Sequence, residues 1–379
     1  MTQLKKIKIA FILQNLNIGG AERVSVTLLR NLDRSKFEII LILLKREGVY
    51  LDLLPPDVEV INLNGNSTLS ALPKIVWSIK KLKPDILFST LFRLNIPILL
   101  AKILALQKIK VVLRIPTTYS LMRESSKSIR QKLELSSIFI KLLYNIADGI
   151  IFISRGSFED FCNHFKKIDK KKCQVIYNPV EIENILKAKD EKIEEPVWSD
   201  KSRKIIAVGR LVPEKGYKYL LDAFSIVSNE IDNIGLIILG EGKERKNLEE
   251  YASKLNLTSN IIFLGSKQNP FKYMSHCDLF VLSSLWEGFA NVVVEAMACG
   301  IPVVATNCPY GPGEIIDNGL NGILVPAKDP KALAQAIILI LKNPELANSL
   351  GRCGFRRALD FDVKKIIKEY EELFCKIVV

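Results

Sequence analysis

The sequence predicts an α/β protein with two doubly wound parallel sheets. The chain has 379 residues, 48% hydrophobic and 25% charged, which is enough for two ordinary domains with full cores. Short β-branched apolar runs alternate with amphipathic segments of helical length almost from end to end, as is typical of parallel βαβ units. The alternation stops once, over residues 181–203, and then restarts.

Residues 1–180 form the predicted N-terminal domain. Seven short apolar runs in it read as strands, with helices expected between them. The predicted strands are Lys8–Leu13, Glu38–Leu44, Val58–Leu63, Ile86–Ser89, Val111–Arg114, Gly149–Ile153 and Cys173–Ile176.

Residues 181–203 are charged and lack a sustained apolar period, so we expect a linker there. Residues 204–360 form the predicted C-terminal domain, and residues 361–379 form a final amphipathic helix. The elements predicted in the second domain are strands at Lys204–Val208, Gly235–Leu239, Ile261–Leu264, Leu279–Leu282 and Pro302–Ala305, and helices at Tyr217–Val227, Glu244–Leu255 and Val292–Cys299.

Composition narrows the class of protein. Seven cysteines form no C-x-x-C pair and only two histidines could join them, which argues against a zinc site and favours reduced thiols in a cytosol. The longest apolar run, Ile96–Leu106, is interrupted by Pro97 and Lys102, short of the ~18 residues that span a bilayer. The apolar run Ile9–Leu13 is too short for a signal peptide. We therefore expect a cytoplasmic protein.

The formal charge of +13 is unevenly placed, with +15 in residues 1–180 and −2 in residues 181–379. A basic half can face nucleic acid, an anionic membrane surface or a phosphorylated substrate, or can be a solvated lysine-rich surface. The basic half contains no aromatic-interleaved patch and no nucleic-acid-binding motif, so nucleic acid is the least expected partner.

Ligands of doubly wound sheets bind beyond the carboxyl ends of the strands, so the loops there are the candidate sites. The first such loop carries Gly19 and Gly20 before a helix. Glycines allow backbone amides to approach an anion closely, and the helix end adds a favourable dipole. A tight turn explains a bare Gly-Gly pair equally well. The loop is not G-x-G-x-x-G, which argues against a nicotinamide cofactor.

The second loop, Gly209–Gly216, again lies between a strand and a helix. Arg210 and Lys215 flank a turn held by two glycines and Pro213. The planar guanidinium of Arg210 and the compact ammonium of Lys215 suit the two phosphate groups of a diphosphate. The third loop, Gly240–Gly242, is either a simple turn or a segment near the ligand.

The segment Ser283–Gly300 is the most informative. Its loop carries Glu287, and an apolar helix begins near Asn291 and contains Glu295. A carboxylate in such a helix requires a bonding partner or a ligand hydroxyl, unless its own helix N-terminus stabilises it. Two carboxylates eight positions apart, on either side of a helix start that can hold phosphate, match a nucleotide sugar.

These motifs together resemble the retaining, nucleotide-sugar-dependent glycosyltransferases of family 4. The likeness runs through Gly19–Arg23, the G-R-x-x-x-x-K-G loop, the E-x7-E segment and Thr306–Ile316, nearly the whole chain. It implies the GT-B fold, in which two Rossmann-like domains face a central cleft and a C-terminal helix crosses back to the first, acceptor-side domain. Residues 361–379 suit that helix.

The resemblance implies roles for single residues. Glu287 would contact the hydroxyls of the donor sugar and Glu295 the ribose, while Arg210 and Lys215 would bind the diphosphate and stabilise the leaving charge. The catalytic group would thus be Glu287, Arg210 and Lys215. Further donor-binding residues would be Gly19, Gly20, Gly209, the amides of Phe289, Ala290, Asn291 and Val292, and Gly265, Ser266 and Lys267 near the base.

One departure concerns a first-domain histidine that many family members carry near the donor sugar. The corresponding stretch, Val111–Thr118, contains no histidine, and Arg114, Thr117 or Thr118 are the acceptor-side candidates instead. A mechanism in which the departing phosphate itself takes the acceptor proton does not need that histidine.

The implied reaction moves a hexose or N-acetylhexosamine from a nucleotide sugar, by the resemblance a UDP sugar, to a polyprenyl-diphosphate-linked or saccharide acceptor in envelope polysaccharide synthesis. No cofactor and no metal are implied, in keeping with the absence of a D-x-D pair in a strand-end loop. Lys102–Lys110 and Ser128–Tyr144 are either segments that rest on the inner face of the membrane or ordinary packed helices. The alternatives are a nucleotide-sugar epimerase of the same fold and a two-domain binding protein without catalysis.

Overall fold

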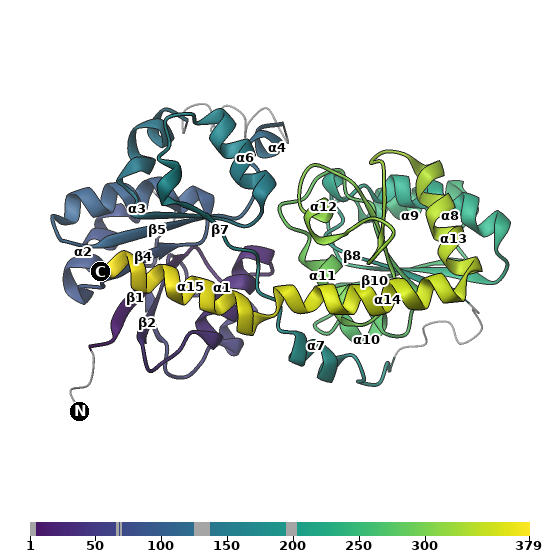
Figure 1. Cartoon of the computed structure of the whole chain (residues 1–379), viewed down its shortest axis with the longest axis horizontal. Helices are drawn as coiled ribbons and strands as arrows, with labels where there is room; N and C mark the ends of the chain where they lie inside the picture. Colours follow the sequence, from purple (N-terminus) through teal and green to yellow (C-terminus); the bar gives the residue numbers. More distant parts are fainter. Residues whose placement is uncertain (1–4, 66–67, 69, 125–136, 195–202) are drawn as a thin grey trace. The chain divides into compact units, whose positions relative to one another are not determined.

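In the computed structural model the chain forms two compact units (Figure 1). Unit 1 comprises Met1–Pro179 and Val363–Val379, and unit 2 comprises Val180–Asp362. The structure describes residues 5–65, 68, 70–124, 137–194 and 203–379.

The sheet of unit 1 is parallel throughout, in the order β3-β2-β1-β4-β5-β6-β7. Its strands are β1 (Ile7–Leu13), β2 (Phe37–Leu43), β3 (Glu59–Asn62), β4 (Ile86–Ser89), β5 (Lys110–Ile115), β6 (Gly149–Phe152) and β7 (Cys173–Val175). They agree with the seven predicted strands to within two residues at either end.

Helices cover both faces of this sheet. In β1, Ala10 and Ile12 point into one hydrophobic core, while Phe11 and Leu13 point into the other. A parallel strand buried on both faces reads as a continuous apolar run, which is why these strands were recognisable in the sequence. The main helices of unit 1 are α1 (Gly20–Asn31), α2 (Leu72–Leu82), α3 (Phe92–Ala105), α4 (Tyr119–Glu124), α6 (Arg155–His164) and α15 (Val363–Val378).

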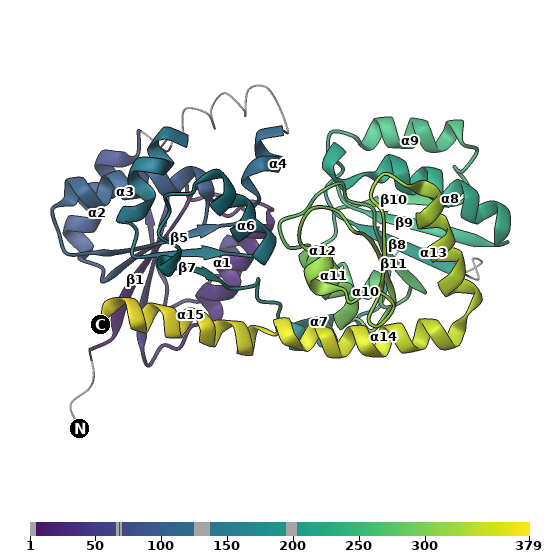
Figure 2. The same cartoon turned by 45° about the horizontal axis from the view of Figure 1, so that its top comes forward.

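The last helix, α15, packs on the unit-1 sheet although the chain reaches it only after unit 2 (Figure 2). The Phe374 ring is fully buried, 5.4 Å from the ring of Phe88. The Glu371 carboxylate accepts hydrogen bonds from the backbone N–H of Asp33 at 2.9 Å and from Lys36 Nζ at 3.0 Å. Apolar packing and this polar clamp together hold α15 on unit 1.

The sheet of unit 2 is also parallel, in the order β10-β9-β8-β11-β12-β13. Numbered within the unit, this is the 3-2-1-4-5-6 order of a Rossmann fold. The strands are β8 (Arg203–Val208), β9 (Ile234–Leu239), β10 (Ile261–Gly265), β11 (Leu279–Leu282), β12 (Val303–Thr306) and β13 (Ile323–Val325). The helices are α7 (Ile182–Ala188), α8 (Tyr217–Glu230), α9 (Arg245–Lys254), α10 (Phe271–Met274), α11 (Asn291–Ala298), α12 (Pro312–Ile315), α13 (Pro330–Lys342) and α14 (Pro344–Ala358).

The expected linker over residues 181–203 requires a correction, because it begins with the helix α7. Ile182 and Ile185 are buried in unit 2. Ile182, Ile185 and Leu186 have the i, i+3, i+4 spacing of a helix, but seven residues are too few for a sustained apolar period, so the segment read as a charged connection.

Two features are absent from the described part of the chain. None of its helices combines the length and the apolar composition required to cross a bilayer. None of its His, Cys, Asp and Glu side chains gather in threes in a way that could hold a metal ion.

Candidate functional site

The candidate site lies where the strand order of unit 2 reverses, between β8 and β11. The chain leaves these two adjacent strands toward α8 and α11, and ligands of such sheets bind at this switch point. The loop after β8 carries Lys215, and the loop after β11 carries Glu287. The sheet therefore brings together two residues that stand 72 positions apart in sequence.

The centre of the site is an ion pair between Lys215 Nζ and Glu287 Oε1 at 2.5 Å. Ser284 Oγ donates a second hydrogen bond to the same oxygen at 2.7 Å. The side chains of Lys215 and Glu287 are 16% and 11% exposed, so the pair is largely withdrawn from water. No residue in the described ranges hydrogen-bonds Glu287 Oε2, which leaves that oxygen available to a ligand hydroxyl.

Backbone contacts fix the two loops to each other. Ser283 Oγ donates to the carbonyl of Lys215 at 2.9 Å, and the N–H of Leu285 donates to the carbonyl of Glu214 at 2.8 Å. Gly216 has a left-handed φ of +63°, and a Cβ there would lie 2.2 Å from the carbonyl oxygen of Ser283. Only glycine allows this approach, so the spacing of Lys215 and Glu287 depends on Gly216.

The negative charge of Glu287 reaches two neighbouring groups. Burial raises the pKa of the Cys308 thiol to about 12, and the charge of Glu287 adds to the shift. Burial also raises the pKa of Tyr217 above its usual range, again helped by Glu287. Both groups stay protonated at neutral pH, and the Tyr217 hydroxyl donates to the carbonyl of Gly209 at 3.0 Å.

The start of α11 is held in an uncommon backbone conformation. Ala290, just before the helix, has a φ of +68°, a region that side chains other than glycine seldom occupy. Gly311 lies against it from the next loop, where a Cβ would be 3.0 Å from the carbonyl carbon of Phe289. The N–H of Glu287 donates to the carbonyl of Pro309 at 3.1 Å. The loop after β12 thus supports both Glu287 and the first turn of α11.

Other predicted donor residues occupy the same edge of the sheet. The Arg210 side chain is 67% exposed, with Nη2 3.6 Å from Glu214 Oε1, and it does not contact the central ion pair. Gly265 ends β10 with a φ of +73°, and its carbonyl accepts from the N–H of Gly240. Glu295 is buried in α11, 7% exposed, one turn beyond the helix start.

The third loop, Gly240–Gly242, packs against the second loop, Gly209–Gly216, which carries Arg210 and Lys215. A Cβ at Gly240 would lie 1.9 Å from the carbonyl oxygen of Gly209, and one at Gly242 would lie 2.2 Å from that of Leu211. The sequence left this loop undecided between a turn and a ligand contact. Glycines are needed at these two positions because a side chain there would collide with the backbone of the Gly209–Gly216 loop.

The predicted residues of unit 1 have mixed outcomes. Gly19 is extended and Gly20 begins α1. A Cβ at Gly20 would have no neighbouring atom within 4 Å, whereas a Cβ at Gly19 would lie 2.1 Å from Glu22 Oε2, so only Gly19 is restricted, and by the end of a flexible side chain. Arg114 is 1% exposed, and its Nη2 donates to Asn178 Oδ1 at 2.5 Å. Arg114 thus packs inside unit 1, and its acceptor-side role stays a prediction. Thr118 is fully buried, and Thr117 is half-buried.

Sequence reasoning missed three supporting residues. Ser284 Oγ donates to Glu287, and Thr306 Oγ1 donates to the carbonyl of Ser284 at 2.5 Å. The Tyr217 hydroxyl donates to the carbonyl of Gly209. The Ser-Ser pair directly after β11 was the available signal. Its meaning depended on knowing which loops are neighbours in the sheet.

Comparison with known families agrees with this geometry. The model of glycosyltransferase family 4 matches residues 18–184, and the model of glycosyl transferases group 1 matches residues 188–357. A diphospho-undecaprenol 4-α-N-acetylgalactosaminyltransferase of Campylobacter jejuni is 31% identical over 373 residues, which span 96% of this chain and 98% of the relative. The chain therefore belongs to the family 4 glycosyltransferases, and the resemblance found in the sequence is confirmed.

Two more proteins extend the comparison. An Escherichia coli enzyme named UDP-Gal:α-D-GlcNAc-diphosphoundecaprenol α-1,3-galactosyltransferase is 24% identical over 99% of this chain and 98% of its own. The crystal structure of HepE from Anabaena with UDP-glucose superposes with a TM-score of 0.79 at 22% identity, over 98% of this chain and all of that one. The fold is GT-B, as predicted.

Proposed function

We propose that this glycosyltransferase transfers a hexose or N-acetylhexosamine from a UDP sugar to a polyprenyl-diphosphate-linked glycan, with retention at the anomeric carbon and without a divalent metal. The observation that carries the proposal is the Lys215–Glu287 ion pair at the switch point of the unit-2 sheet. Support for the substrates comes from the two relatives named for diphospho-undecaprenol acceptors and from the UDP-glucose complex of HepE.

The geometry suits this chemistry. Lys215 donates one of its three N–H groups to Glu287, and the other two can point at the diphosphate, with the exposed Arg210 in the same loop as a second cation. Oε2 of Glu287 can accept from the donor sugar. The first amides of α11 add hydrogen-bond donors for phosphate. Two cations and a helix start can balance the diphosphate charge without a metal.

In the proposed step the bond between the anomeric carbon and the β-phosphate oxygen breaks, and that oxygen keeps the electron pair. The acceptor hydroxyl oxygen bonds to the anomeric carbon on the same face. Its proton passes to the departing phosphate. Lys215 and Arg210 stabilise the charge that develops on the leaving group, an effect that usually outweighs any single proton transfer.

A nucleotide screen tests the donor assignment. We expect UDP and its sugar conjugates, but not GDP or ADP, to raise the melting temperature without added metal, because a ligand of the folded state stabilises it by mass action. Glu295→Ala should weaken UDP binding, and Glu287→Ala should weaken only the sugar conjugates. Unchanged melting of folded protein with every nucleotide would contradict the donor site.

Lys215→Ala should bind UDP with a modest loss while turnover falls about 100-fold, the typical effect of removing one preorganised donor. Lys218→Ala, three positions on and exposed, is the matched control. Equal turnover in both variants would remove Lys215 from the mechanism. Consumption of the UDP sugar without acceptor, with a changed sugar as product, would point to epimerisation instead.

We also propose that unit 1 contacts an anionic membrane surface. Leu104 and Leu106, at the end of α3, are 53% and 89% exposed, and Lys108 follows them. Lys102 does not take part, because its Nζ is bound to Asp148 at 2.5 Å. Residues 128–136 of the segment Ser128–Tyr144 lie outside the described residues, and in the rest of that segment Ile138 is exposed.

A further inference from the structure

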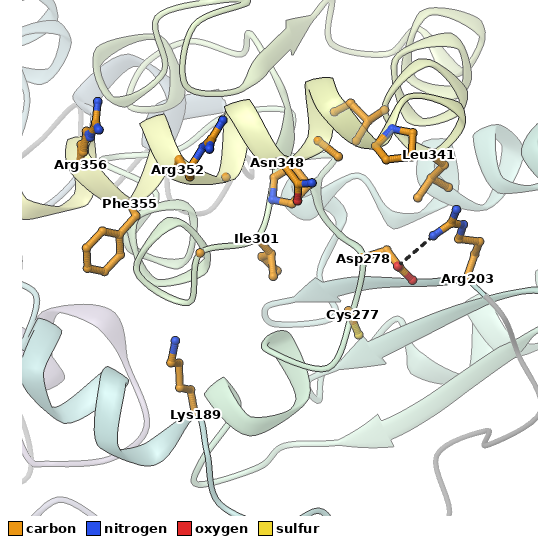
Figure 3. A pocket seen from close by; sticks show the side chains of 16 residues that line it. Lys189, Arg203, Cys277, Asp278, Ile301, Leu341, Asn348, Arg352, Phe355 and Arg356 are labelled. Carbon is orange, nitrogen blue, oxygen red and sulfur yellow. Dashed lines mark hydrogen bonds and ion pairs between the residues drawn. The ribbon is translucent and has the colours of Figure 1, made fainter.

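A second pocket of about 830 Å³ lies in unit 2, away from the Lys215–Glu287 site. Its walls are one face of α14, the end of α7 and the turns before β11 and β12 (Figure 3). Arg203 opens β8, and Asp278 directly precedes β11, so the pocket is at the amino edge of the sheet. β8 has six residues. At about 3.3 Å per residue, about 17 Å of strand separates the two sites.

The charges around this pocket do not balance. Lys189, Arg203, Arg352 and Arg356 line it, whereas Asp278 is the one carboxylate among its described lining residues. Asp278 already holds Arg203 at 3.4 Å and accepts the N–H of Lys204 at 2.7 Å. In the described part of the chain, no ion pair involves Lys189, Arg352 or Arg356. Three positive charges are therefore left without a counter-charge.

This excess is local rather than a property of the whole half. Residues 181–379 have a net charge of −2. Arg352 and Arg356 stand one turn apart on α14, where side chains are neighbours and like charges repel. Burial raises the pKa of the Cys277 thiol above its usual range, so this lining residue adds no negative charge. A bound anion would relieve the repulsion.

The pocket also has apolar lining residues, and the helix α14 on one side of it is packed tightly against a neighbouring loop. Ile301, Leu341 and Phe355 line it beside the cations. A Cβ at Gly351 would lie 2.5 Å from the carbonyl oxygen of Gly300, so the backbone of α14 rests directly on that loop. Its volume is within the range of small-molecule sites, which pair apolar walls with a few placed charges.

We propose that this pocket is a second ligand site, which binds a small molecule carrying a phosphate or diphosphate group next to an apolar portion. The anionic group lies against Arg352 and Arg356, which are neighbours on α14, and the apolar portion lies against Ile301 and Phe355. Guanidinium groups recognise phosphate oxygens. The site is separate from the donor site and goes beyond the proposed transfer reaction.

Isothermal titration calorimetry tests the proposal on the full chain carrying Lys215→Ala, which weakens phosphate binding at the donor site. The probes are inorganic pyrophosphate, geranyl diphosphate, geraniol, and dihexanoyl-phosphatidylglycerol below its micelle concentration. We expect pyrophosphate to bind, geranyl diphosphate to bind more tightly, and geraniol not to bind. Tighter binding of the glycerophospholipid than of geranyl diphosphate would assign the phosphate to a lipid headgroup, and the reverse to a soluble phosphate ester.

Adding Arg352→Gln with Arg356→Gln should weaken geranyl diphosphate binding at least 10-fold. Both side chains are exposed, so the melting temperature should stay unchanged. The matched control is Lys331→Gln with Lys342→Gln, which removes the same charge from exposed positions of α13 outside the pocket. Absence of binding, or equal weakening in both double variants, would overturn the second site.

Discussion

At the residue scale, the placement of Glu287 depends on its neighbours Lys215, Ser284 and Thr306. Lys215 and Ser284 share its Oε1, and Thr306 holds the carbonyl of Ser284. A carboxylate that is 11% exposed would be costly to keep charged without such partners. The same partners leave Oε2 for a ligand. The hydrogen bonds to Oε1 therefore both stabilise the charged Glu287 in the absence of a ligand and keep Oε2 available for the donor sugar.

Gly216 allows a prediction at this scale, with Gly319 as its matched control. Both have a left-handed φ, +63° and +81°, but only at Gly216 would a Cβ meet another atom, the Ser283 carbonyl oxygen at 2.2 Å. Gly319→Ala should cost about 1 kcal/mol of unfolding free energy from backbone strain alone. Gly216→Ala should cost about 2–4 kcal/mol because overpacking adds to the strain.

Urea unfolding of the two variants measures the loss of unfolding free energy in each. UDP titration of the folded variants shows the effect on the site. UDP binding should weaken in Gly216→Ala and stay unchanged in Gly319→Ala. Equal destabilisation of the two variants would mean that the loops after β8 and β11 are not locked together at this glycine.

At the scale of elements, α15 makes unit 1 from two distant parts of the chain. Phe374 packs between Phe88 and Phe37, with ring centroids 5.4 and 6.2 Å away, and it is fully buried. Phe374→Ala should therefore destabilise unit 1 by about 3–5 kcal/mol. Lys368→Ala, on the exposed face of the same helix, should cost less than about 0.5 kcal/mol.

Hydrogen exchange resolved by peptide measures this effect unit by unit. Protection should fall in β1, β2 and β4 of the Phe374→Ala variant, while β8 and β11 of unit 2 keep theirs. A uniform loss over both units would mean that they unfold as one cooperative body, although the cores of unit 1 and the core of unit 2 are separate.

At the scale of the whole molecule, the charge of +15 in residues 1–180 predicts salt-dependent attachment to anionic membranes. Binding to phosphatidylglycerol-containing vesicles should fall steeply between roughly 0.05 and 0.5 M salt, over which the Debye length shortens about threefold. Leu104→Ser with Leu106→Ser should weaken vesicle binding further. Leu339→Ser, at a 51% exposed position in unit 2, should not.

Vesicle co-sedimentation provides the measurement, with phosphatidylcholine vesicles as the uncharged control. Binding that does not depend on salt concentration would contradict attachment through unit 1. So would equal weakening of vesicle binding by Leu339→Ser and by Leu104→Ser with Leu106→Ser. A salt-dependent result without an effect of the leucines would restrict the contact to charge alone.

The sequence by itself determined the α/β class, the seven strands of unit 1, the start of α11 and the family. Strands buried on both faces and loops marked by Gly, Arg, Lys and Glu are local signals that one stretch of chain can carry. Tertiary structure decided which loops meet. It placed Lys215 beside Glu287, buried Arg114 against Asn178, folded α7 from an apparent linker and left three cations around the second pocket. Such contacts arise from strand order and helix packing, which no single stretch encodes.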